Sequence, residues 1–308
     1  MASLISPFVV ASGRNFRLRR MDPGGSTHLP LKKEDAPALL SKTVGRIAAL
    51  QERLYAHDRW GVLLIFQAMD AAGKDSVIKH VLSGINPQGC QVSSFKVPSS
   101  EELGHDFLWR TTARLPERGR IGVFNRSYYE EVLVVRVHPE LLEHQRLPAS
   151  LVTPRLWRER YEDIVAFERH LARSGFVIRK FFLNVSQDEQ RRRFLKRLDE
   201  PDKRWKFSSG DLKERARWND YMAAYEETIR RTSAPHAPWI VVPADRKWYA
   251  HQVVASAVED ALAGLDLQMP KIRAGERREI ERARRALATS SSPGSSPSRP
   301  SRGSSSAS

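Results

Sequence analysis

Residues 60–76 read Trp-Gly-Val-Leu-Leu-Ile-Phe-Gln-Ala-Met-Asp-Ala-Ala-Gly-Lys-Asp-Ser, an apolar run of strand length followed by a tight turn and a Gly-Lys pair. A strand that turns directly into a helix presents unpaired backbone N–H groups and the positive end of the helix dipole to an anion. Lys74 adds a point charge there, so the stretch predicts a phosphate-binding loop and phosphoryl-transfer chemistry. The spelling is incomplete, because Ala68 stands where glycine is usual and Asp75, with Ser76 after it, follows the lysine. Gly-Lys pairs also occur in ordinary strand-to-helix turns, and this stretch alone leaves that alternative open.

The composition is that of a globular protein, with 308 residues of which 41% are hydrophobic. The single cysteine, Cys90, excludes an internal disulfide framework and fits a reducing compartment, so we expect a cytoplasmic protein. No apolar run approaches the roughly 20 residues that span a bilayer. Residues 1–10 are too short for a signal peptide and lack its charged leader, so we expect no membrane partner.

The net charge of +15 is unevenly distributed along the chain. Residues 190–217 carry eleven basic side chains against five acidic ones, and residues 269–288 carry seven against three. Such a surplus predicts a polyanionic partner, which can be nucleic acid, an anionic membrane surface or a phosphate-rich substrate. A solvated helix face is the alternative, because charge runs usually have no partner beyond water.

Apolar runs of strand length alternate with helical patterns through most of the chain, which predicts an α/β fold with a parallel sheet flanked by helices. The expected strands are 62–66, 92–97, 121–124, 177–185 and 240–242. The expected helices are 42–58, 74–85, 101–115, 154–174, 187–198, 211–232 and 248–265. We expect an N-terminal arm over 1–40, a phosphate-loop kinase-like domain over 41–268, and a basic, Ser-rich disordered tail over 269–308.

A second polar cluster closes the strand 121–124, where the chain continues as Asn125, Arg126 and, after a short interval, Glu130. Because ligands gather at the carboxyl ends of parallel strands, this cluster is expected beside the loop that follows strand 62–66. Asp70 in that loop should stay ionised next to a lysine and could hold Mg²⁺ or orient an attacking phosphate oxygen. Both features have local alternatives, a helix cap by Ser127 and ordinary turn hydrogen bonding by Asp70.

Residues 190–217 predict a lid: a basic helix broken at Pro201, a basic loop, and a second helix capped by a serine or aspartate near 208–211. A helix-loop-helix rich in Arg and Lys can close over phosphates, exclude water and neutralise charge. Trp205 and Phe207 are expected to anchor this loop to the body of the domain rather than to stack on bases.

These features together resemble the polyphosphate kinase 2 family over roughly residues 30–265. The resemblance is carried by Met69-Asp-Ala-Ala-Gly-Lys74, by Ser94-Phe-Lys-Val-Pro98 with His105-Asp-Phe-Leu-Trp-Arg110, by Phe124-Asn-Arg-Ser-Tyr-Tyr-Glu130, and by Pro201 to Lys206 with Ser208. It implies transfer of phosphoryl groups between inorganic polyphosphate and nucleotides with Mg²⁺ as cofactor. It also implies a homo-oligomer, either a dimer or a tetramer.

The resemblance further implies a role for each matching residue. Asp70, Lys74 and Arg126 would be catalytic, with Asp70 as the Mg²⁺ ligand. The residues that would bind substrate are Gly73, Asp75, Ser76, Lys96, Arg110, Asn125, Glu130, Arg193, Arg197, Lys203 and Lys206. Asn125 stands where many members have a magnesium-binding Asp, and with Glu130 it resembles the branch that accepts both AMP and ADP.

Two other functions stay open at this point. One is an ordinary nucleotide kinase with ATP as donor. The other is a nucleic-acid-binding protein with an inactive phosphate loop, for which the basic residues 271–285 provide at least nonspecific affinity. Ala68 also departs from the family pattern and would restrict the loop if that position required a positive φ.

Overall fold

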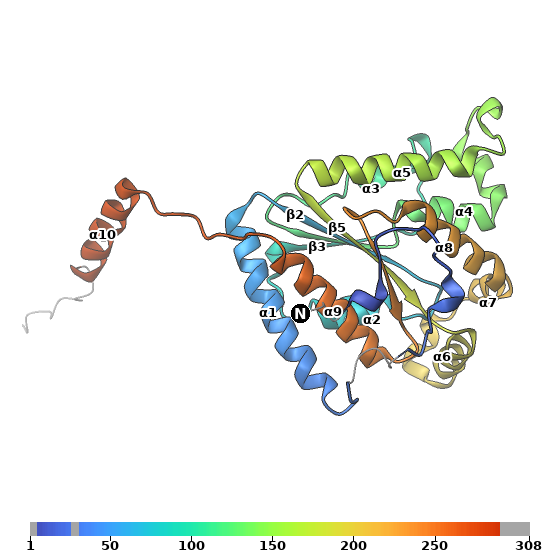
Figure 1. The fold of residues 1–308 in the computed structure, drawn as a ribbon, viewed down its shortest axis with the longest axis horizontal. Coiled ribbons are helices and arrows are strands. Elements are labelled where there is room, and N and C mark those ends of the chain that lie inside the picture. Colours follow the sequence, from blue (N-terminus) through green and yellow to red (C-terminus); the bar gives the residue numbers. More distant parts are fainter. Residues whose placement is uncertain (1–4, 26–30, 290–308) are drawn as a thin grey trace, which may run out of the picture. The chain divides into compact units, whose positions relative to one another are not determined.

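The computed structural model describes residues 5–25 and 31–289 of the chain. Its centre is a six-stranded sheet with the order β1-β6-β5-β2-β4-β3 (Figure 1). All neighbouring strands pair in parallel except β1, which pairs antiparallel with β6. The predicted α/β class and parallel sheet are therefore confirmed. The strands are β1 Val9–Val10, β2 Gly61–Gln67, β3 Cys90–Ser94, β4 Ile121–Asn125, β5 Phe176–Asn184 and β6 Trp239–Pro243.

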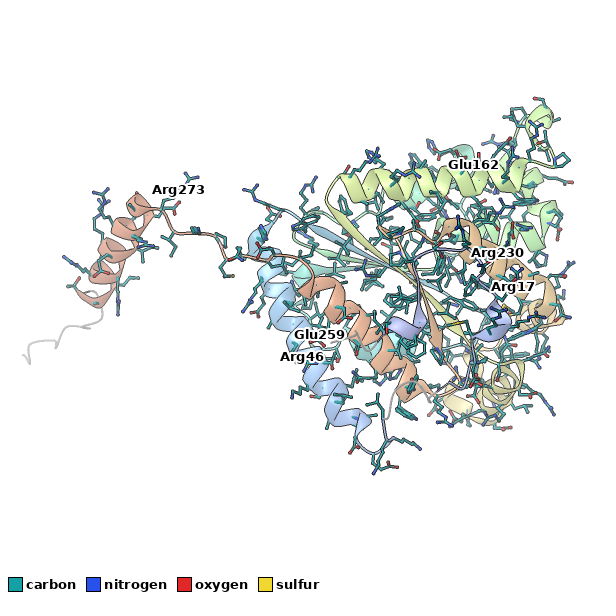
Figure 2. All side chains as sticks on the ribbon, in the orientation of Figure 1. Arg17, Arg46, Glu162, Arg230, Glu259 and Arg273 are labelled. Atoms are coloured by element: carbon teal, nitrogen blue, oxygen red, sulfur yellow. The ribbon has the colours of Figure 1, made fainter. Side chains whose placement is uncertain are left out.

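Helices cover both faces of this sheet, which is why β2 is buried along its whole length. One face carries α1 Ala36–His57, α2 Lys74–Val81 and α9 Lys247–Ala263, and the other carries α4 Val134–Val137, α5 Leu156–Arg173 and α8 Trp218–Thr232 (Figure 1). Arg46 of α1 pairs with Glu259 of α9, with 2.8 Å between Nη2 and Oε2 (Figure 2). The remaining helices are α3 Trp109–Thr112, α6 Gln187–Asp199, α7 Ser209–Ala216 and α10 Ala274–Thr289. The short 3₁₀ turns are η1 Ser6–Phe8, η2 Leu18–Arg20, η3 Pro87–Gly89, η4 Glu102–Gly104, η5 Tyr128–Val132, η6 Pro139–Gln145, η7 Ala149–Leu151 and η8 Pro201–Lys206.

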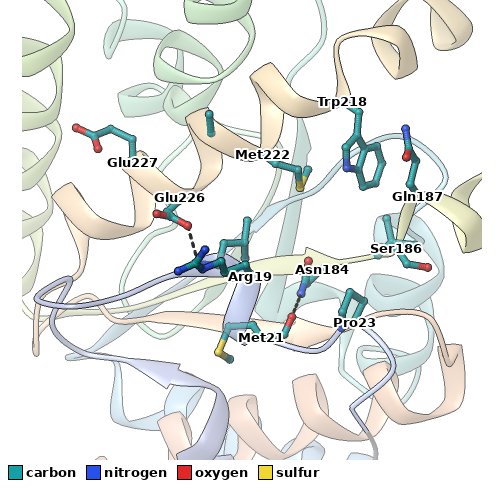
Figure 3. A pocket seen from close by; sticks show the side chains of 13 residues that line it. Arg19, Met21, Pro23, Asn184, Ser186, Gln187, Trp218, Met222, Glu226 and Glu227 are labelled. Atoms are coloured by element: carbon teal, nitrogen blue, oxygen red, sulfur yellow. Dashed lines mark hydrogen bonds between the residues drawn. The ribbon is translucent and has the colours of Figure 1, made fainter.

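The N-terminal segment differs from the arm that the sequence predicted, because its described residues pack into the core. Phe8 is almost fully buried, and β1 extends the sheet at the β6 edge. Glu226 of α8 accepts a hydrogen bond from the backbone N–H of Leu18 at 2.8 Å. Asn184 donates to the carbonyl of Met21 at 2.8 Å (Figure 3). The strand is only two residues long and the other anchors follow no period, so no periodic pattern marked them in the sequence.

The predicted helix over 101–115 is wrong in its extent. The structure has only η4 and the single turn α3 in this region. Between them the side chain of Asp106 accepts a hydrogen bond from the backbone N–H of Leu108, two residues further along the chain, at 2.9 Å. Such a local side-chain bond competes with helix formation. The predicted helix over 211–232 is likewise two helices, α7 and α8, separated at Arg217.

Residues from Met269 onward form a separate unit, of which the structure describes 269–289. Here α10 replaces part of the disordered tail that the sequence predicted. The flexible Ser-rich stretch expected over 290–308 lies outside the described residues. Among the described residues, no helix combines the length and the apolar character that crossing a bilayer requires.

Candidate active site

The loop 68–73 lies at the carboxyl end of β2, where the chain order of the sheet reverses between β2 and β5. This is the point at which open α/β sheets bind their ligands. Two residues of the loop take left-handed backbone conformations, Ala71 with φ 61° and Gly73 with φ 108°. The Lys74 ammonium closes the loop by donating to the carbonyl of Ala68 at 2.8 Å. Ala68 itself does not have a positive φ, so alanine at this position does not strain the loop.

Arg193 of α6 fastens this loop from below. Its Nη1 donates to the carbonyls of Ala71 and Ala72 at 3.0 and 2.7 Å, and its Nη2 donates to those of Ala244 and Asp245 at 2.6 and 3.2 Å. Its Nε donates to Glu189 at 2.7 Å. All five guanidinium donors therefore have protein acceptors. We infer that Arg193 positions the loop, while its predicted contact with polyphosphate stays a prediction.

The carboxyl end of β4 brings Arg126 to the loop, as the sequence predicted. Arg126 has φ 64°, and its N–H donates to the carbonyl of Phe66 at 3.0 Å, which ties the turn to β2. Its guanidinium lies 3.2 Å from Oδ1 of Asp70 and 3.8 Å from Oε2 of Glu130. Asn125 donates to Asp75 of α2 at 2.8 Å. The alternative helix cap is also present, since Ser127 accepts from the N–H of Tyr129 at 3.1 Å.

The charges of this cluster influence one another's ionisation. Burial lowers the pKa of Lys74, against the opposing effect of Asp70. Burial also opposes the charge of Arg126, but Glu130 and Asp70 outweigh it and raise the pKa of Arg126. Burial raises the pKa of Glu130, although Arg126 and Lys74 favour its charged form. Lys74, Arg126 and the two carboxylates thus form one electrostatic unit, in which a bound anion would interact with both cations at short range.

A fully buried network under η5 supports Arg126, and neither its lysine nor its glutamate was among the residues predicted from the sequence. Lys180 of β5 and Glu168 of α5 are 0% and 1% exposed, with 2.7 Å between Nζ and Oε2. The hydroxyls of Tyr128 and Tyr129 donate to Oε1 of Glu168 at 2.9 and 2.7 Å. Because these tyrosines follow Arg126 in the chain at an interval of two and three residues, the network fixes the turn that aims its guanidinium.

A cavity of about 680 Å³ opens above the loop. Seven basic side chains and two carboxylates line it, so its charge is complementary to a polyanion. The predicted site residues that line it are Asp70, Gly73, Lys74, Asp75, Ser76, Lys96, Asn125, Arg126, Arg193 and Arg197. Sequence reasoning missed Ser94, Lys196 and Lys247, which also line it.

Two predicted residues whose side chains the structure describes, Arg110 and Glu130, do not line this cavity. Arg110 is 7% exposed and donates to the carbonyl of Lys96 at 2.9 Å, so it holds the backbone that carries Lys96. Glu130 contacts the cavity residue Arg126, with 3.8 Å between Oε2 and Nη1. The side chains of Lys203 and Lys206 lie outside what the structure describes.

The predicted lid has the expected helix-loop-helix form in α6, η8 and α7. Ser208 caps α7 by accepting from the N–H of Gly210 at 3.2 Å. Arg197 of α6 reaches Asp211 of α7, with 3.6 Å between Nη1 and Oδ2. Trp205 is 78% exposed, so the expectation that both aromatic residues anchor the loop to the body is wrong for Trp205, whereas Phe207 is half-buried. Opening and closing of this segment stays a prediction.

A second cavity, of about 570 Å³, lies between the N-terminal segment and α8 (Figure 3). Its lining includes Arg19, Trp218 and Met222, together with Glu226 and Glu227. Among the predicted site residues whose side chains the structure describes, none lines it. Its two glutamates disfavour a phosphate ligand, so we place the chemistry in the first cavity.

The donor set at the first cavity fits Mg²⁺ rather than a metal held by a protein cage. Within the described residues no three His, Cys, Asp or Glu side chains form a metal-binding group. Mg²⁺ is commonly held by one or two carboxylates, with substrate phosphates and water as its other ligands. Asp70, whose side chain is 29% exposed beside the loop, offers such a carboxylate.

Comparison with known proteins agrees with this geometry. The family model described as Polyphosphate kinase 2 matches residues 30–270. The chain belongs to the polyphosphate kinase 2 family. It is 55% identical over 256 residues to a protein of Rhodopseudomonas palustris named ADP-polyphosphate phosphotransferase, covering 83% of this chain and 89% of that protein. A protein of Meiothermus ruber named AMP/ADP-polyphosphate phosphotransferase is 45% identical, with coverage of 83% and 92%.

A solved structure extends this agreement to the fold. The crystal structure of polyphosphate kinase 2 from Arthrobacter aurescens matches with a TM-score of 0.82 at 42% identity, covering 91% of this chain and 97% of that one. The α/β architecture described above is therefore the family's, and loop 68–73 lies within the matched family segment.

Proposed function

We propose that this polyphosphate kinase 2 family member catalyses the reversible, Mg²⁺-dependent transfer of a phosphoryl group from inorganic polyphosphate to AMP and ADP, giving ADP and ATP. The observation that carries the proposal is the cavity in which Asp70, Lys74 and Arg126 meet among further basic side chains. Such a cavity can hold two polyanions at once, which an acceptor nucleotide and a polyphosphate donor require.

The chemistry needs positioning and charge neutralisation more than covalent catalysis. Lys74 and the N-terminus of α2 would bind the donor phosphates at the loop. Arg126 would stabilise the charge that spreads over the transferred group. Asp70, paired with Arg126 at 3.2 Å, would hold the metal and orient the acceptor oxygen for in-line attack. A bound Mg²⁺ would supply Lewis-acid polarisation of the phosphate oxygens.

The acceptor is the finer part of the proposal. The relative that is 55% identical is named for ADP alone, and the one that is 45% identical is named for AMP and ADP. Asn125 and Glu130 support the dual use through the family resemblance. In this structure Asn125 bonds Asp75 and Glu130 pairs with Arg126, so both are placed beside the proposed acceptor-activating groups.

The test uses purified protein, Mg²⁺, long-chain polyphosphate and either AMP or ADP, with no nucleotide donor. We expect ADP to form from AMP and ATP to form from ADP. If product formed with ADP but not with AMP, the acceptor would be ADP only. An ATP-dependent nucleotide kinase would form nothing without ATP, and a nucleic-acid-binding protein would transfer no phosphate at all.

Two variants test the site itself. Lys74→Ala and Asp70→Asn should each lower turnover by about two orders of magnitude or more, since each removes a charge from the reacting centre. Circular dichroism should show both variants folded. Near-unchanged rates in either variant would refute the site assignment. The homo-oligomer and the cytoplasmic location also stay proposals, which sedimentation and cell fractionation would test.

A further inference from the structure

The helix α10 lies beyond the segment that the family model matches, which ends at residue 270. Its sequence is nevertheless strongly patterned. Residues 269–289 contain seven basic and three acidic side chains, and every residue from 268 to 289 is exposed. No residue of α10 is buried within the described part of the chain. Packing within the protein therefore does not explain why α10 is so rich in arginine.

The arginines are arranged for binding along the helix axis. Arg278, Arg282 and Arg285 follow one another at intervals of four and three, which places them on one face. They span about 10 Å of helix length at 1.5 Å rise per residue. Arg277 and Arg284 are separated by seven residues and form a second row beside the first.

The acidic residues of α10 compensate these charges only in part. Glu281 pairs with Arg285 at 3.6 Å, but both side chains are more than half exposed, so the pair is weak. Glu276 accepts from the backbone N–H of Arg273 at 2.7 Å and thereby caps the helix start. Among the described residues, Arg277 and Arg284 form no ion pair. The face thus presents several guanidinium groups, which bind phosphate oxygens in bidentate fashion.

We propose that α10 is a second, non-catalytic binding site for inorganic polyphosphate, which captures long chains for the catalytic domain. The proposal rests on the proposed function, because polyphosphate is the polyanion that the enzyme already uses. Because α10 is joined to the catalytic domain by the polypeptide chain, a polyphosphate molecule bound to α10 has a higher local concentration at that domain.

Two other anionic partners fit this helix less well. Residues 269–289 contain no aromatic side chain, and proteins that bind single-stranded nucleic acid rely on stacking against aromatics. The only large apolar residues of α10 are Ile280 and Leu287. Helices that lie in a membrane interface need a wider apolar face, commonly with aromatics.

The test changes the arginine face in the full chain. Arg278→Gln, Arg282→Gln and Arg285→Gln are combined in one variant, because glutamine keeps the helix propensity of arginine. The matched control replaces the same three residues by lysine, which keeps the charge. Steady-state kinetics are measured with long-chain polyphosphate and with a short-chain fraction, with ADP as acceptor.

We expect the glutamine variant to raise KM for long-chain polyphosphate about tenfold, with kcat unchanged and with KM for the short-chain fraction unchanged. In a plot of log KM for long-chain polyphosphate against log salt concentration, the slope should fall by about two, because three phosphate contacts are lost. The lysine control should retain most of the long-chain affinity. An unchanged long-chain KM, or equal increases for both chain lengths, would overturn the proposal.

Direct binding separates this inference from the proposed function. Fluorescence anisotropy with labelled long-chain polyphosphate should show weaker binding to the glutamine variant even if the protein transferred no phosphate. A single-stranded DNA of matched charge serves as the competitor. If the triple substitution weakened DNA binding and left polyphosphate binding intact, α10 would be a nucleic-acid site and the proposal would fail.

Discussion

The buried pair of Lys180 and Glu168 provides a sharp test of how the site is held. Both side chains are almost fully buried, and they are 2.7 Å apart. Lys180 also donates to the Tyr129 hydroxyl at 3.0 Å and to the carbonyl of Thr232 at 2.7 Å. Glu168→Gln would leave the lysine charge without its counter-ion, and Lys180→Met would leave the carboxylate with only the tyrosine hydroxyls. Each single change should therefore lower the free energy of unfolding by about 3–5 kcal/mol.

The double variant, Lys180→Met with Glu168→Gln, removes both charges together. Replacing a buried ion pair by uncharged groups of similar size is often close to neutral, so the double variant should be more stable than either single one. Urea unfolding of the four proteins gives the free energies, and the coupling energy should be larger than the loss in either single variant, at least about 3 kcal/mol in magnitude. Equal slopes with denaturant in all four would show that two-state unfolding is retained.

The same network predicts an effect on catalysis. Tyr128 and Tyr129 tie η5 to Glu168 directly after Arg126, so losing the carboxylate should lower kcat under conditions where the variant is still folded. Additive losses in the unfolding experiment would refute the coupled network. Full kcat in a folded Glu168→Gln variant would refute its role in aiming Arg126.

Three further predictions concern the loop and its surroundings. Gly73→Ala should lower stability by about 1–2 kcal/mol and also lower activity, because Gly73 has φ 108°. Gly45→Ala is the control: position 45 is an exposed position of α1 where a Cβ meets no atom within 4 Å, so this change should be neutral or stabilising in a thermal melt of both variants. Burial lowers the pKa of His251 to about 4. As pH falls, the unfolded chain therefore takes up a proton on this histidine before the folded chain does. The free energy of unfolding should decrease between about pH 6.5 and 4, by about 3 kcal/mol for this residue. Urea titrations of His251→Gln should show a smaller decrease over this pH range, and an unchanged pH dependence would contradict the assignment. Chelation of Mg²⁺ by EDTA should abolish transfer and leave the melting temperature of the ligand-free protein unchanged, because Asp70 is a ligand that relies on substrate phosphates; a large drop in that temperature would indicate a protein cage instead.

The parts of the fold that the sequence predicted are those encoded in contiguous apolar runs. The run that forms β2 is buried on both faces, so its length and composition sufficed to predict both the strand and the loop after it. The predicted meeting of Arg126 with Asp70 followed from parallel strand order, since the carboxyl ends of β2 and β4 lie at one edge.

The parts that the sequence did not predict depend on contacts between distant residues. Lys180 is a lysine inside a strand, and its burial is explained by its partners Glu168, Tyr129 and the carbonyl of Thr232, which are distant along the chain. The N-terminal segment is held by Glu226, 208 residues away along the chain from its partner Leu18. Lys247 lines the cavity from α9, 174 residues after Gly73 of the loop, and no local motif marks it.

The basic residues around the loop are not equivalent, although the sequence counts them alike. Arg193 uses every donor on protein oxygens and determines the shape of the loop. Lys96 lines the same cavity with an exposed side chain, and this side chain does not hold the loop in place. Because a polyanion can displace water from Lys96 but must displace protein oxygens from Arg193, the first contributes affinity and the second contributes geometry. The charge available to polyphosphate is therefore smaller than the basic surplus of the sequence, and this is a physical reason for an additional arginine face outside the cavity to matter.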